Sequence, residues 1–430
     1  MQQVGYTYSQ QTYSLLCRFG ITLIAVAWAT VSMAQSTGTA MRMCVSKSAR
    51  ARFEVLYAFP GGKAGIGPGN VIRDAAGNLY GMTGAGGDLK CDLTGSLGCG
   101  VVFKLNSAPK ETVLHRFHGN PTDQGTPFGG VVRDSAGHLY GTTSGIPLYN
   151  GTVFKVDRNG KETVLYKFNG GSDGLEPLAG LVRDGAGNLY GTTNAGGIGG
   201  PSGQGVVFKV DASGKETVLY SFSGGTDGAG PMAGLILDSA GNLYGTTASS
   251  GALGLGVAFK LDTSGTEHVL HSFTGGADGA APLAGVVRDS AGNIYGTTAN
   301  RGNLQCNLNG SGGCGVVFKL NAAGKLTALH TFAGTTDGGV PSADLLLDAT
   351  GNLYGATGFG GDLGCTPFGN GCGVVFKLDK TGKETVLHTF TGGSDRGAPS
   401  TLVQDGAGNL YGAAAIGRVS NSGVVFRIAP

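Results

Sequence analysis

The sequence predicts an all-β fold, a seven-bladed β-propeller in which each blade has four antiparallel strands. Glycine and proline contribute 83 and 14 of the 430 residues, roughly twice their ordinary share. The glycines return at fixed positions, which indicates turns, and the 40% of hydrophobic residues argues against a disordered chain. Helical periodicity is absent throughout, so short strands joined by tight turns account for the pattern.

Three short motifs each return seven times along the chain, which is the pattern of a radial repeat array. The first resembles GNLYG and has its tyrosine at Tyr80, Tyr140, Tyr190, Tyr244, Tyr295, Tyr354 and Tyr411. The second resembles VVFK and has its phenylalanine at Phe103, Phe154, Phe208, Phe259, Phe318, Phe376 and Phe426. The third resembles KETVLYSF and ends at Phe59, Phe117, Phe168, Phe222, Phe273, Phe332 and Phe390.

Each unit contains four strand-like segments, lettered A to D in chain order. In the third unit they are residues 178–183, 188–193, 205–210 and 216–222. Each segment is rich in β-branched and aromatic residues and is bounded by Gly, Asp or Ser, as strands and hairpin turns require. Four strands joined by hairpins make a propeller blade.

The two ends of the array predict a closed ring. The first strand of the propeller, residues 53–59, has the D motif, whereas the last strand, residues 423–428, has the C motif. The final unit therefore lacks strand D, and the N-terminal strand can supply it. Such closure removes exposed sheet edges, which favours a ring over a linear solenoid.

Charge excludes several classes of partner. The chain has 30 Lys and Arg against 28 Asp and Glu, and charged residues make only 13% of the total. This balance gives no basic surface for nucleic acid and none for an anionic membrane.

The N-terminus predicts export to the periplasm or the medium. Residues 21–34 form an apolar run that follows Arg18 and ends in small residues, which is typical of a signal peptide cleaved after Ala34. An uncleaved anchor is the alternative, but fourteen residues fall short of the roughly 20 that cross a bilayer. We expect a signal peptide at 1–34, a linker at 35–52, a propeller at 53–430, and no stable membrane span in the mature chain.

Six cysteines fall in local pairs, each in a loop between strands B and C. In an exported chain such pairs predict disulfides, each worth roughly 2.5 kcal/mol by loop entropy. Zinc is the alternative, but the usual C-x-x-C spacing is missing. The expected bonds are Cys91 with Cys99, Cys306 with Cys314, and Cys365 with Cys372, which leaves Cys44 without a partner.

Aspartates recur in the loops between strand D and the next strand A. They have two readings: a ring of carboxylates that binds a sugar or a cation such as Ca²⁺, or caps that each hold their own turn. No other cofactor is expected. The residues are Asp123, Asp173, Asp227, Asp278, Asp337 and Asp395, and the first unit has Ala64 instead.

A second set of aspartates, at the turns between strands A and B, is expected to be structural: Asp74, Asp134, Asp184, Asp238, Asp289, Asp348 and Asp405. Cross-strand ion pairs are expected between strands C and D. The pairs are Lys104 with Glu111, Lys155 with Glu162, Lys209 with Glu216, Lys260 with Glu267, and Lys377 with Glu384.

The histidines do not predict a catalytic centre. Four of them take the place of the tyrosine in the third motif on four different blades, so they cannot converge on one metal: His115, His271, His330 and His388. No G-x-S-x-G motif accompanies them. The single tryptophan, Trp28, lies in the signal segment, so the tryptophan motifs of WD40 and sialidase propellers are missing.

The repeat resembles a known family. The unit P-x-A-G-x-V-x-D-x-A-G-N-L-Y-G-T-T followed by G-x-V-F-K-L-D-x-x-G-K-E-T-V-L-Y-x-F resembles the tandem GloVer repeat of exported bacterial choice-of-anchor proteins, over about residues 53–428. More distantly, strands A and B are similar to NHL and gluconolactonase-like propellers. The resemblance implies export and a propeller, and it assigns no chemistry.

We therefore expect a secreted, non-catalytic propeller, a monomer that presents a binding surface to a glycan, a protein or a cell-surface component. The alternative is an enzyme, a metal-dependent propeller hydrolase or lactonase with its ion in the central channel. Whether the chain catalyses any reaction is left open by the sequence.

Overall fold

The computed structural model describes residues 51–91, 98–145, 148–308, 310, 312–365, 369–416 and 422–430. The expected signal peptide, nearly all of the expected linker, and Cys44 lie outside these residues. Within them, the only helical segments are two short 3₁₀ turns, η1 (Gly62–Ala64) and η2 (Gly200–Ser202). None of the described helices is long and apolar enough to cross a membrane.

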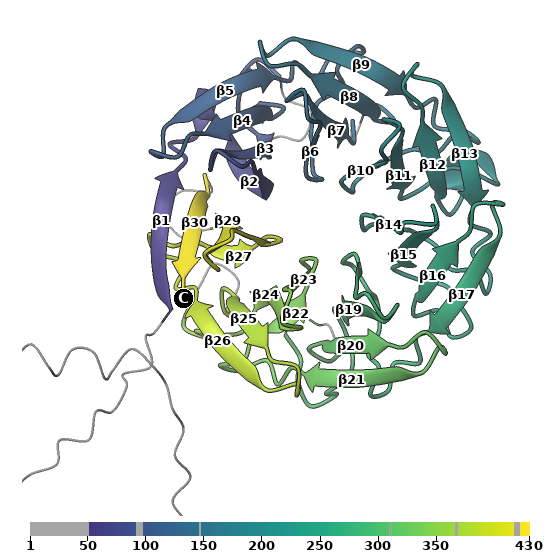
Figure 1. The fold of residues 1–430 in the computed structure, drawn as a ribbon, viewed down its shortest axis with the longest axis vertical. Coiled ribbons are helices and arrows are strands. Elements are labelled where there is room, and N and C mark those ends of the chain that lie inside the picture. The colour runs from purple at the N-terminus through teal and green to yellow at the C-terminus, as the bar shows by residue number, and fades with distance from the viewer. Residues whose placement is uncertain are drawn as a thin grey trace, which may run out of the picture. The chain divides into compact units, whose positions relative to one another are not determined.

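Seven antiparallel sheets surround a central channel and confirm the predicted seven-bladed propeller (Figure 1). Blade 1 contains β2 (Ile66–Arg73), β3 (Leu79–Ala85), β4 (Val101–Leu105) and β5 (Glu111–Arg116). Blade 2 contains β6 (Val132–Arg133), β7 (Leu139–Thr143), β8 (Thr152–Val156) and β9 (Glu162–Lys167). Blade 3 contains β10 (Val182–Arg183), β11 (Leu189–Thr193), β12 (Val206–Val210) and β13 (Glu216–Ser221).

The remaining blades follow the same order from the channel outwards. Blade 4 contains β14 (Ile236–Leu237), β15 (Leu243–Thr247), β16 (Val257–Leu261) and β17 (Glu267–Ser272). Blade 5 contains β18 (Val287–Arg288), β19 (Ile294–Thr298), β20 (Val316–Leu320) and β21 (Leu326–Thr331). Blade 6 contains β22 (Gly339–Pro341), β23 (Leu346–Leu347), β24 (Leu353–Phe359), β25 (Val374–Leu378) and β26 (Glu384–Thr389).

Blade 7 closes the ring as the two chain ends predict. It contains β27 (Gly397–Pro399), β28 (Val403–Gln404), β29 (Leu410–Ile416), β30 (Val424–Ala429) and, from the N-terminal side, β1 (Arg52–Ala58). β1 pairs antiparallel with β30, from Arg52 opposite Ala429 to Ala58 opposite Val424. The purple first strand therefore lies beside the yellow last strand in Figure 1.

Strand A is much shorter than expected in most blades. In blade 3 it spans Val182–Arg183 only, whereas the sequence predicted residues 178–183. The preceding residues, Leu178 to Leu181, line the central cavity instead of pairing with strand B. These residues therefore form part of the channel wall and not part of the sheet.

The core consists of layers between neighbouring blades. The phenylalanine that follows strand D of one blade meets the strand C phenylalanine of the next edge to face, with ring centroids 5.1 to 5.5 Å apart at all seven contacts. Phe168 and Phe208 illustrate the pair, and both are fully buried. Gly191 on strand B lies over the Phe208 ring, and a Cβ there would come within 2.7 Å of Phe208 Cζ.

A β-bulge on strand D sets which way its side chains face. In blade 3, Tyr220 lies opposite Val207 while Val218 lies opposite Phe208, so Leu219 is an extra residue. Glu216 and Tyr220, four residues apart, would share one face of a regular strand. The bulge places them on opposite faces, so Glu216 faces blade 2 and Tyr220 faces blade 4. The same shift occurs on strand D of every blade.

Candidate binding site in the central channel

A cavity of about 490 Å³ occupies the central channel. It is lined in every blade by residues just before or within the inner strands, and Ala415 of β29 adds to the wall. These strands lie towards the middle of the ring in Figure 1. Pockets of this size hold small-molecule ligands in many proteins.

One side of the channel wall is apolar. Blades 2 to 5 each place a large apolar side chain directly after the proline that precedes strand A, and all four line the cavity: Phe128, Leu178, Met232 and Leu283. Phe128 is 54% exposed and Met232 is 40% exposed, which is unusual for such large apolar side chains. Two residues further on, all four blades have glycine: Gly130, Gly180, Gly234 and Gly285.

The other side of the wall is polar, because blades 6, 7 and 1 replace that glycine with Asp344, Thr401 and Asn70. Ser342 in blade 6 and Ser400 in blade 7 add hydroxyl groups to the same cavity. The wall therefore has an apolar arc (Phe128, Leu178, Met232 and Leu283) and a polar arc (Asn70, Ser342, Asp344, Ser400 and Thr401).

Hydrogen bonds hold the polar arc in place across four blades. The Gly285 N–H donates to Asp344 Oδ1 at 2.6 Å, and the Asp344 N–H donates to Thr401 Oγ1 at 3.1 Å. The Thr401 N–H in turn donates to Asn70 Oδ1 at 3.2 Å. Blades 5, 6, 7 and 1 are thus linked in sequence at the channel, so the polar side chains are oriented before any ligand arrives.

Asp344 is the only carboxylate among the described residues that line the cavity. Burial raises the pKa of its carboxyl, and the hydrogen bond from the Gly285 N–H opposes that rise. Such a carboxyl accepts hydrogen bonds when ionised and can donate one when protonated. Together with the neighbouring amide and hydroxyl groups it can bind a ligand rich in hydroxyl groups.

The six aspartates of the loops between strands D and A do not line this cavity. Each lies between two blades and accepts hydrogen bonds from its own loop. Asp173 accepts from the Asn169 and Gly171 N–H groups and from the Tyr166 hydroxyl, the last at 2.8 Å. Loop bonds of this kind are found at Asp123, Asp227, Asp278, Asp337 and Asp395. Ligand binding by these six residues stays a prediction.

The second set of aspartates holds the turns between strands A and B. Asp184 accepts hydrogen bonds from the Asn188 N–H at 2.8 Å and from the Tyr190 hydroxyl at 3.0 Å. The tyrosine bond recurs in all seven blades. These bonds lower the pKa of each carboxyl, Asp184 among them, and are structural in character.

The predicted ion pairs between strands C and D do not form, so that prediction is wrong. In blade 3, Glu216 lies opposite Val210, and Lys209 lies opposite Thr217. Because adjacent residues of a strand point to opposite faces, Lys209 and Glu216 cannot meet. Lys209 lies over the Tyr190 ring instead, 5.9 Å from its centroid. The same register separates the other four pairs, Lys104 with Glu111, Lys155 with Glu162, Lys260 with Glu267, and Lys377 with Glu384.

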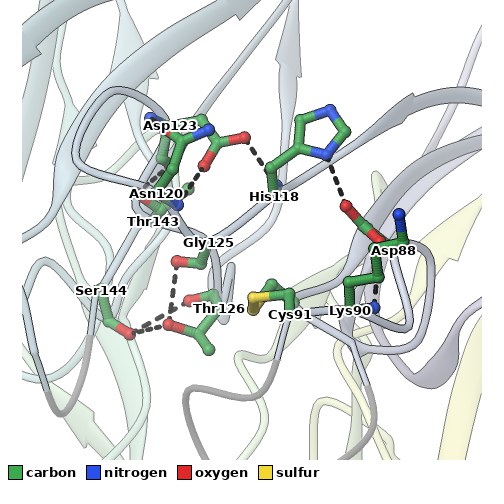
Figure 2. The surroundings of a disulfide bond; sticks show 11 residues. Asp88, Lys90, Cys91, His118, Asn120, Asp123, Gly125, Thr126, Thr143 and Ser144 are labelled. Carbon is green, nitrogen blue, oxygen red and sulfur yellow. Dashed lines mark hydrogen bonds and ion pairs between the residues drawn. A yellow bond between two sulfur atoms is a disulfide. The ribbon is translucent and has the colours of Figure 1, made fainter.

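Three disulfide bonds, all predicted, brace loops between strands B and C. They join Cys91 with Cys99, Cys306 with Cys314, and Cys365 with Cys372, with Cα atoms 5.6 to 5.7 Å apart. Figure 2 shows the first, beside Thr126 of the loop that leads to blade 2. The Thr126 N–H donates to Cys99 O at 2.9 Å, so the bridged loop supports the segment that enters the channel wall.

The channel site itself was missed by sequence reasoning. The signal is nevertheless present: aligned on the aspartate of the A-to-B turn, four repeats have glycine at the fourth residue before it, and three have Asn, Asp or Thr. Glycine at this position is sufficient for the fold in four blades, so the polar residues in the other three are candidates for a role in binding.

Comparisons with known proteins agree with the fold. The Gloeobacter/Verrucomicrobia repeat matches residues 28–200, 148–312 and 305–430. No curated protein matches the chain. A similar solved structure is the extracellular domain attributed to a hybrid two component system of B. thetaiotaomicron, with 14% identity and a TM-score of 0.51. A second is the extracellular domain attributed to a one component system of the same organism, with 13% identity and a TM-score of 0.50.

In both cases the match covers 88% of this chain and 41% of the other, so the chain spans less than half of those domains. A gluconolactonase from Xanthomonas campestris is 15% identical over 72% of this chain and 87% of its own, with a TM-score of 0.43. At these identities the first two likenesses establish the propeller fold.

Proposed function

Because the chain belongs to the Gloeobacter/Verrucomicrobia repeat family, whose repeats here build a closed propeller, we propose that it is an exported binding scaffold that holds a glycan in its central channel. The observation that carries this proposal is the two-sided wall of the cavity. A sugar ring has apolar C–H faces and a hydroxyl-bearing edge. The apolar arc suits the former, and the polar arc suits the latter.

Export is supported by the disulfide bonds. Such bonds form and persist in oxidising compartments such as the periplasm or the medium. The predicted signal peptide at 1–34 agrees with that destination.

The alternative of a metal-dependent lactonase has less support from the channel. Hard cations such as Ca²⁺ take six to eight oxygen ligands, usually with several carboxylates among them. The described lining offers the single carboxylate of Asp344. The polar arc offers five side chains that can form hydrogen bonds with neutral hydroxyl groups. A glycan can therefore use all five of them, whereas a cation would depend mainly on Asp344.

The proposal is tested by glycan binding to the mature chain, residues 35–430. An array of bacterial and plant oligosaccharides identifies the tightest ligand, and calorimetry then compares the parent with the variant Asn70→Gly/Asp344→Gly/Thr401→Gly. Glycine already stands at these positions in blades 2 to 5, so the fold is retained. We expect at least tenfold weaker binding by the variant, about 1.4 kcal/mol or more.

Lys215→Ala is the matched control, because Lys215 is exposed on a turn between strands C and D and far along the blade from the channel. It should bind as the parent does. Equal affinity of the glycine variant and the parent, or binding of no glycan with turnover of lactones instead, contradicts the proposal.

A further inference from the structure

The outer part of the propeller has a polar cluster at each contact between consecutive blades, called a junction here. A junction combines the Tyr or His of strand D, the Asp of the following loop (Ala64 between blades 7 and 1), and a residue at the start of strand D of the next blade. That third residue is glutamate at five junctions: Glu111, Glu162, Glu216, Glu267 and Glu384. At the other two the equivalent residue is Leu326 and, one residue into β1, Phe53.

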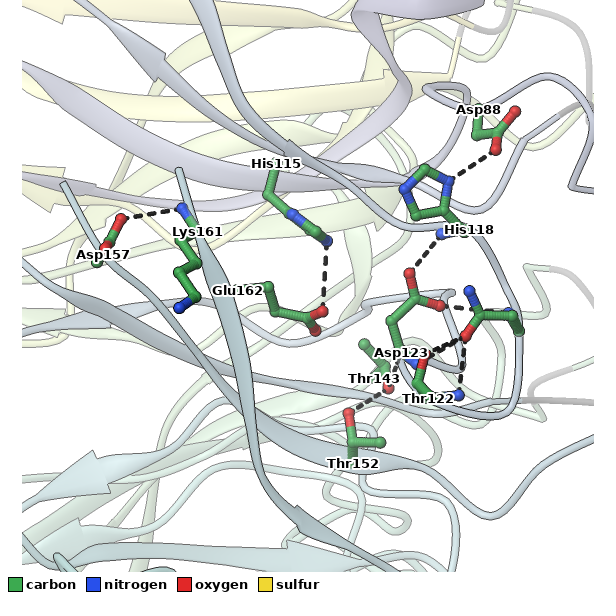
Figure 3. A network of polar contacts seen from close by, with 11 residues as sticks. Asp88, His115, His118, Thr122, Asp123, Thr143, Thr152, Asp157, Lys161 and Glu162 are labelled. Atoms are coloured by element: carbon green, nitrogen blue, oxygen red, sulfur yellow. Dashed lines mark hydrogen bonds and ion pairs between the residues drawn. The ribbon is translucent and has the colours of Figure 1, made fainter. Parts of the chain in front are cut away.

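Only two junctions contain His, Asp and Glu together. They are His115 with Asp123 and Glu162, between blades 1 and 2, and His330 with Asp337 and Glu384, between blades 5 and 6. In each, one ligand atom per residue lies within 4.8 Å of the other two. Figure 3 shows the first, with the His115 ring directed towards Glu162 and Asp123 close by.

At these two junctions the histidine Nε2 atom stands 3.5 to 3.9 Å from the nearest carboxylate oxygens recorded beside it, farther than at the other histidine junctions. Where glutamate is missing, histidine bonds its aspartate directly: His271 Nε2 lies 2.9 Å from Asp278 Oδ2, and His388 Nε2 lies 3.1 Å from Asp395 Oδ2. Where tyrosine replaces histidine beside a loop aspartate, its hydroxyl bonds that aspartate in the same way, as Tyr166 does to Asp173 at 2.8 Å. Tyr57, whose loop has Ala64, donates to Glu111 instead.

When all three groups are present they stand further apart. His330 Nε2 lies 3.5 Å from Asp337 Oδ2 and 3.9 Å from Glu384 Oε2, and His115 Nε2 lies 3.6 Å from Glu162 Oε2. Both Nε2 atoms are buried without a close hydrogen-bond partner, and this distinguishes the two junctions. The glutamate Oε1 atoms are unpaired too, but the same is true of Glu111, Glu216 and Glu267 at the junctions without histidine. Unpaired buried polar atoms are costly, so this arrangement calls for a missing partner.

A zinc ion meets that requirement. Zinc binds His nitrogen at about 2.0 to 2.1 Å and carboxylate oxygen at about 2.0 to 2.2 Å, which places tetrahedral ligands about 3.3 Å apart. The observed 3.5 to 3.9 Å separations are close to that value and too long for hydrogen bonds. A dication also balances the charge of two carboxylates. The side chains of His115, Glu162, His330, Asp337 and Glu384 are 13 to 19% exposed, so an ion can reach them from solvent.

We propose that the two His–Asp–Glu junctions, His115 with Asp123 and Glu162 and His330 with Asp337 and Glu384, are zinc sites that join neighbouring blades. Each site takes one ligand from strand D of one blade, one from its loop, and one from strand D of the next, so an ion there cross-links the two blades. The fourth zinc position is left to water.

The sites are tested by zinc binding to the full mature chain with Cys44→Ser, which removes the remaining thiol. After treatment with EDTA the protein is titrated with Zn²⁺ by calorimetry, and bound zinc is measured by mass spectrometry after gel filtration. We expect two ions per chain, one in His115→Tyr, one in His330→Tyr, and none in the double variant. Tyrosine occupies this position in blades 2 and 3, so these variants retain the fold.

His271→Tyr is the control, because its junction has Leu326 in place of the glutamate. It should still bind two ions. Thermal unfolding in EDTA checks that each variant is folded, and in zinc it should show a rise in Tm for the parent that the double variant lacks. The proposal is overturned if the parent retains no zinc, or if the double variant retains as much as the parent.

Discussion

The layers between blades and the wall of the central channel are made by the same repeat, but only the layers keep it regular. The edge-to-face phenylalanine contact occurs seven times with nearly one geometry, and so does the bond from tyrosine to the turn aspartate. The channel wall instead changes from glycine in blades 2 to 5 to Asp344, Thr401 and Asn70 in blades 6, 7 and 1. The comparison teaches that repetition marks the scaffold, whereas departures from it mark the candidate site.

The largest effect should come from breaking an inter-blade layer. Phe208→Ala removes a fully buried ring that contacts Phe168 edge to face. We expect a loss of about 3 to 5 kcal/mol in the free energy of unfolding, because a cavity is left in a tightly filled core. Urea denaturation measures the change. A loss below about 1 kcal/mol would show that the layers do not carry the stability assigned to them.

A smaller loss is expected at the bridged loops. Replacing Cys91 and Cys99 together by serine opens a bridge of sequence separation 8 and should cost about 2.5 kcal/mol by loop entropy. The loop supports Thr126 beside the channel, so glycan affinity should also fall slightly. Unchanged denaturation midpoints in the double-serine variant would mean that the bridge does not contribute to stability.

The junction glutamates should make stability depend on pH. Burial raises the pKa of Glu216 to about 7, and the nearby Asp173 carboxylate adds to the rise. The folded protein therefore binds more protons than the unfolded chain between about pH 4.5 and pH 7. Its free energy of unfolding should fall as pH rises through that window.

Glu216→Gln removes one such group at a junction that has tyrosine rather than histidine. Denaturation in EDTA at pH 5 and pH 8 should then show a smaller difference than in the parent. A difference as large as the parent's would place the titrating group elsewhere.

The smallest effect on stability should come from the channel wall. Thr401→Gly makes blade 7 like blades 2 to 5 and should change the free energy of unfolding by less than about 1 kcal/mol, while it weakens glycan binding. Strong destabilisation with unchanged affinity would reverse the distinction between scaffold and site.

Most of the scaffold could be predicted from the sequence, because each repeat contains the strand and turn residues that build one blade. The strand motifs gave seven blades, the unmatched end strands gave the pairing of β1 with β30, and the paired cysteines gave the disulfides. The junctions could not be derived, because the bulge at Leu219 is not visible in the strand pattern. The register at the turn between strands C and D, which pairs Glu216 with Val210, separates Glu216 from Lys209, and the bulge puts Tyr220 on the face opposite to Glu216.

The channel site was overlooked for a different reason. Its polar residues come from repeats that are far apart in the chain, and only ring closure brings Asn70 beside Thr401. A ligand site assembled in that way becomes evident when the first and last blades are placed next to each other.

A crystal structure with the tightest-binding glycan from the array tests the central claim most directly. We predict that the sugar lies in the channel, with hydroxyl groups within hydrogen-bond distance of Asp344 and Asn70 and its apolar face on Phe128. A sugar bound on the outer strands or the bridged loops, with the channel unoccupied, would contradict this account.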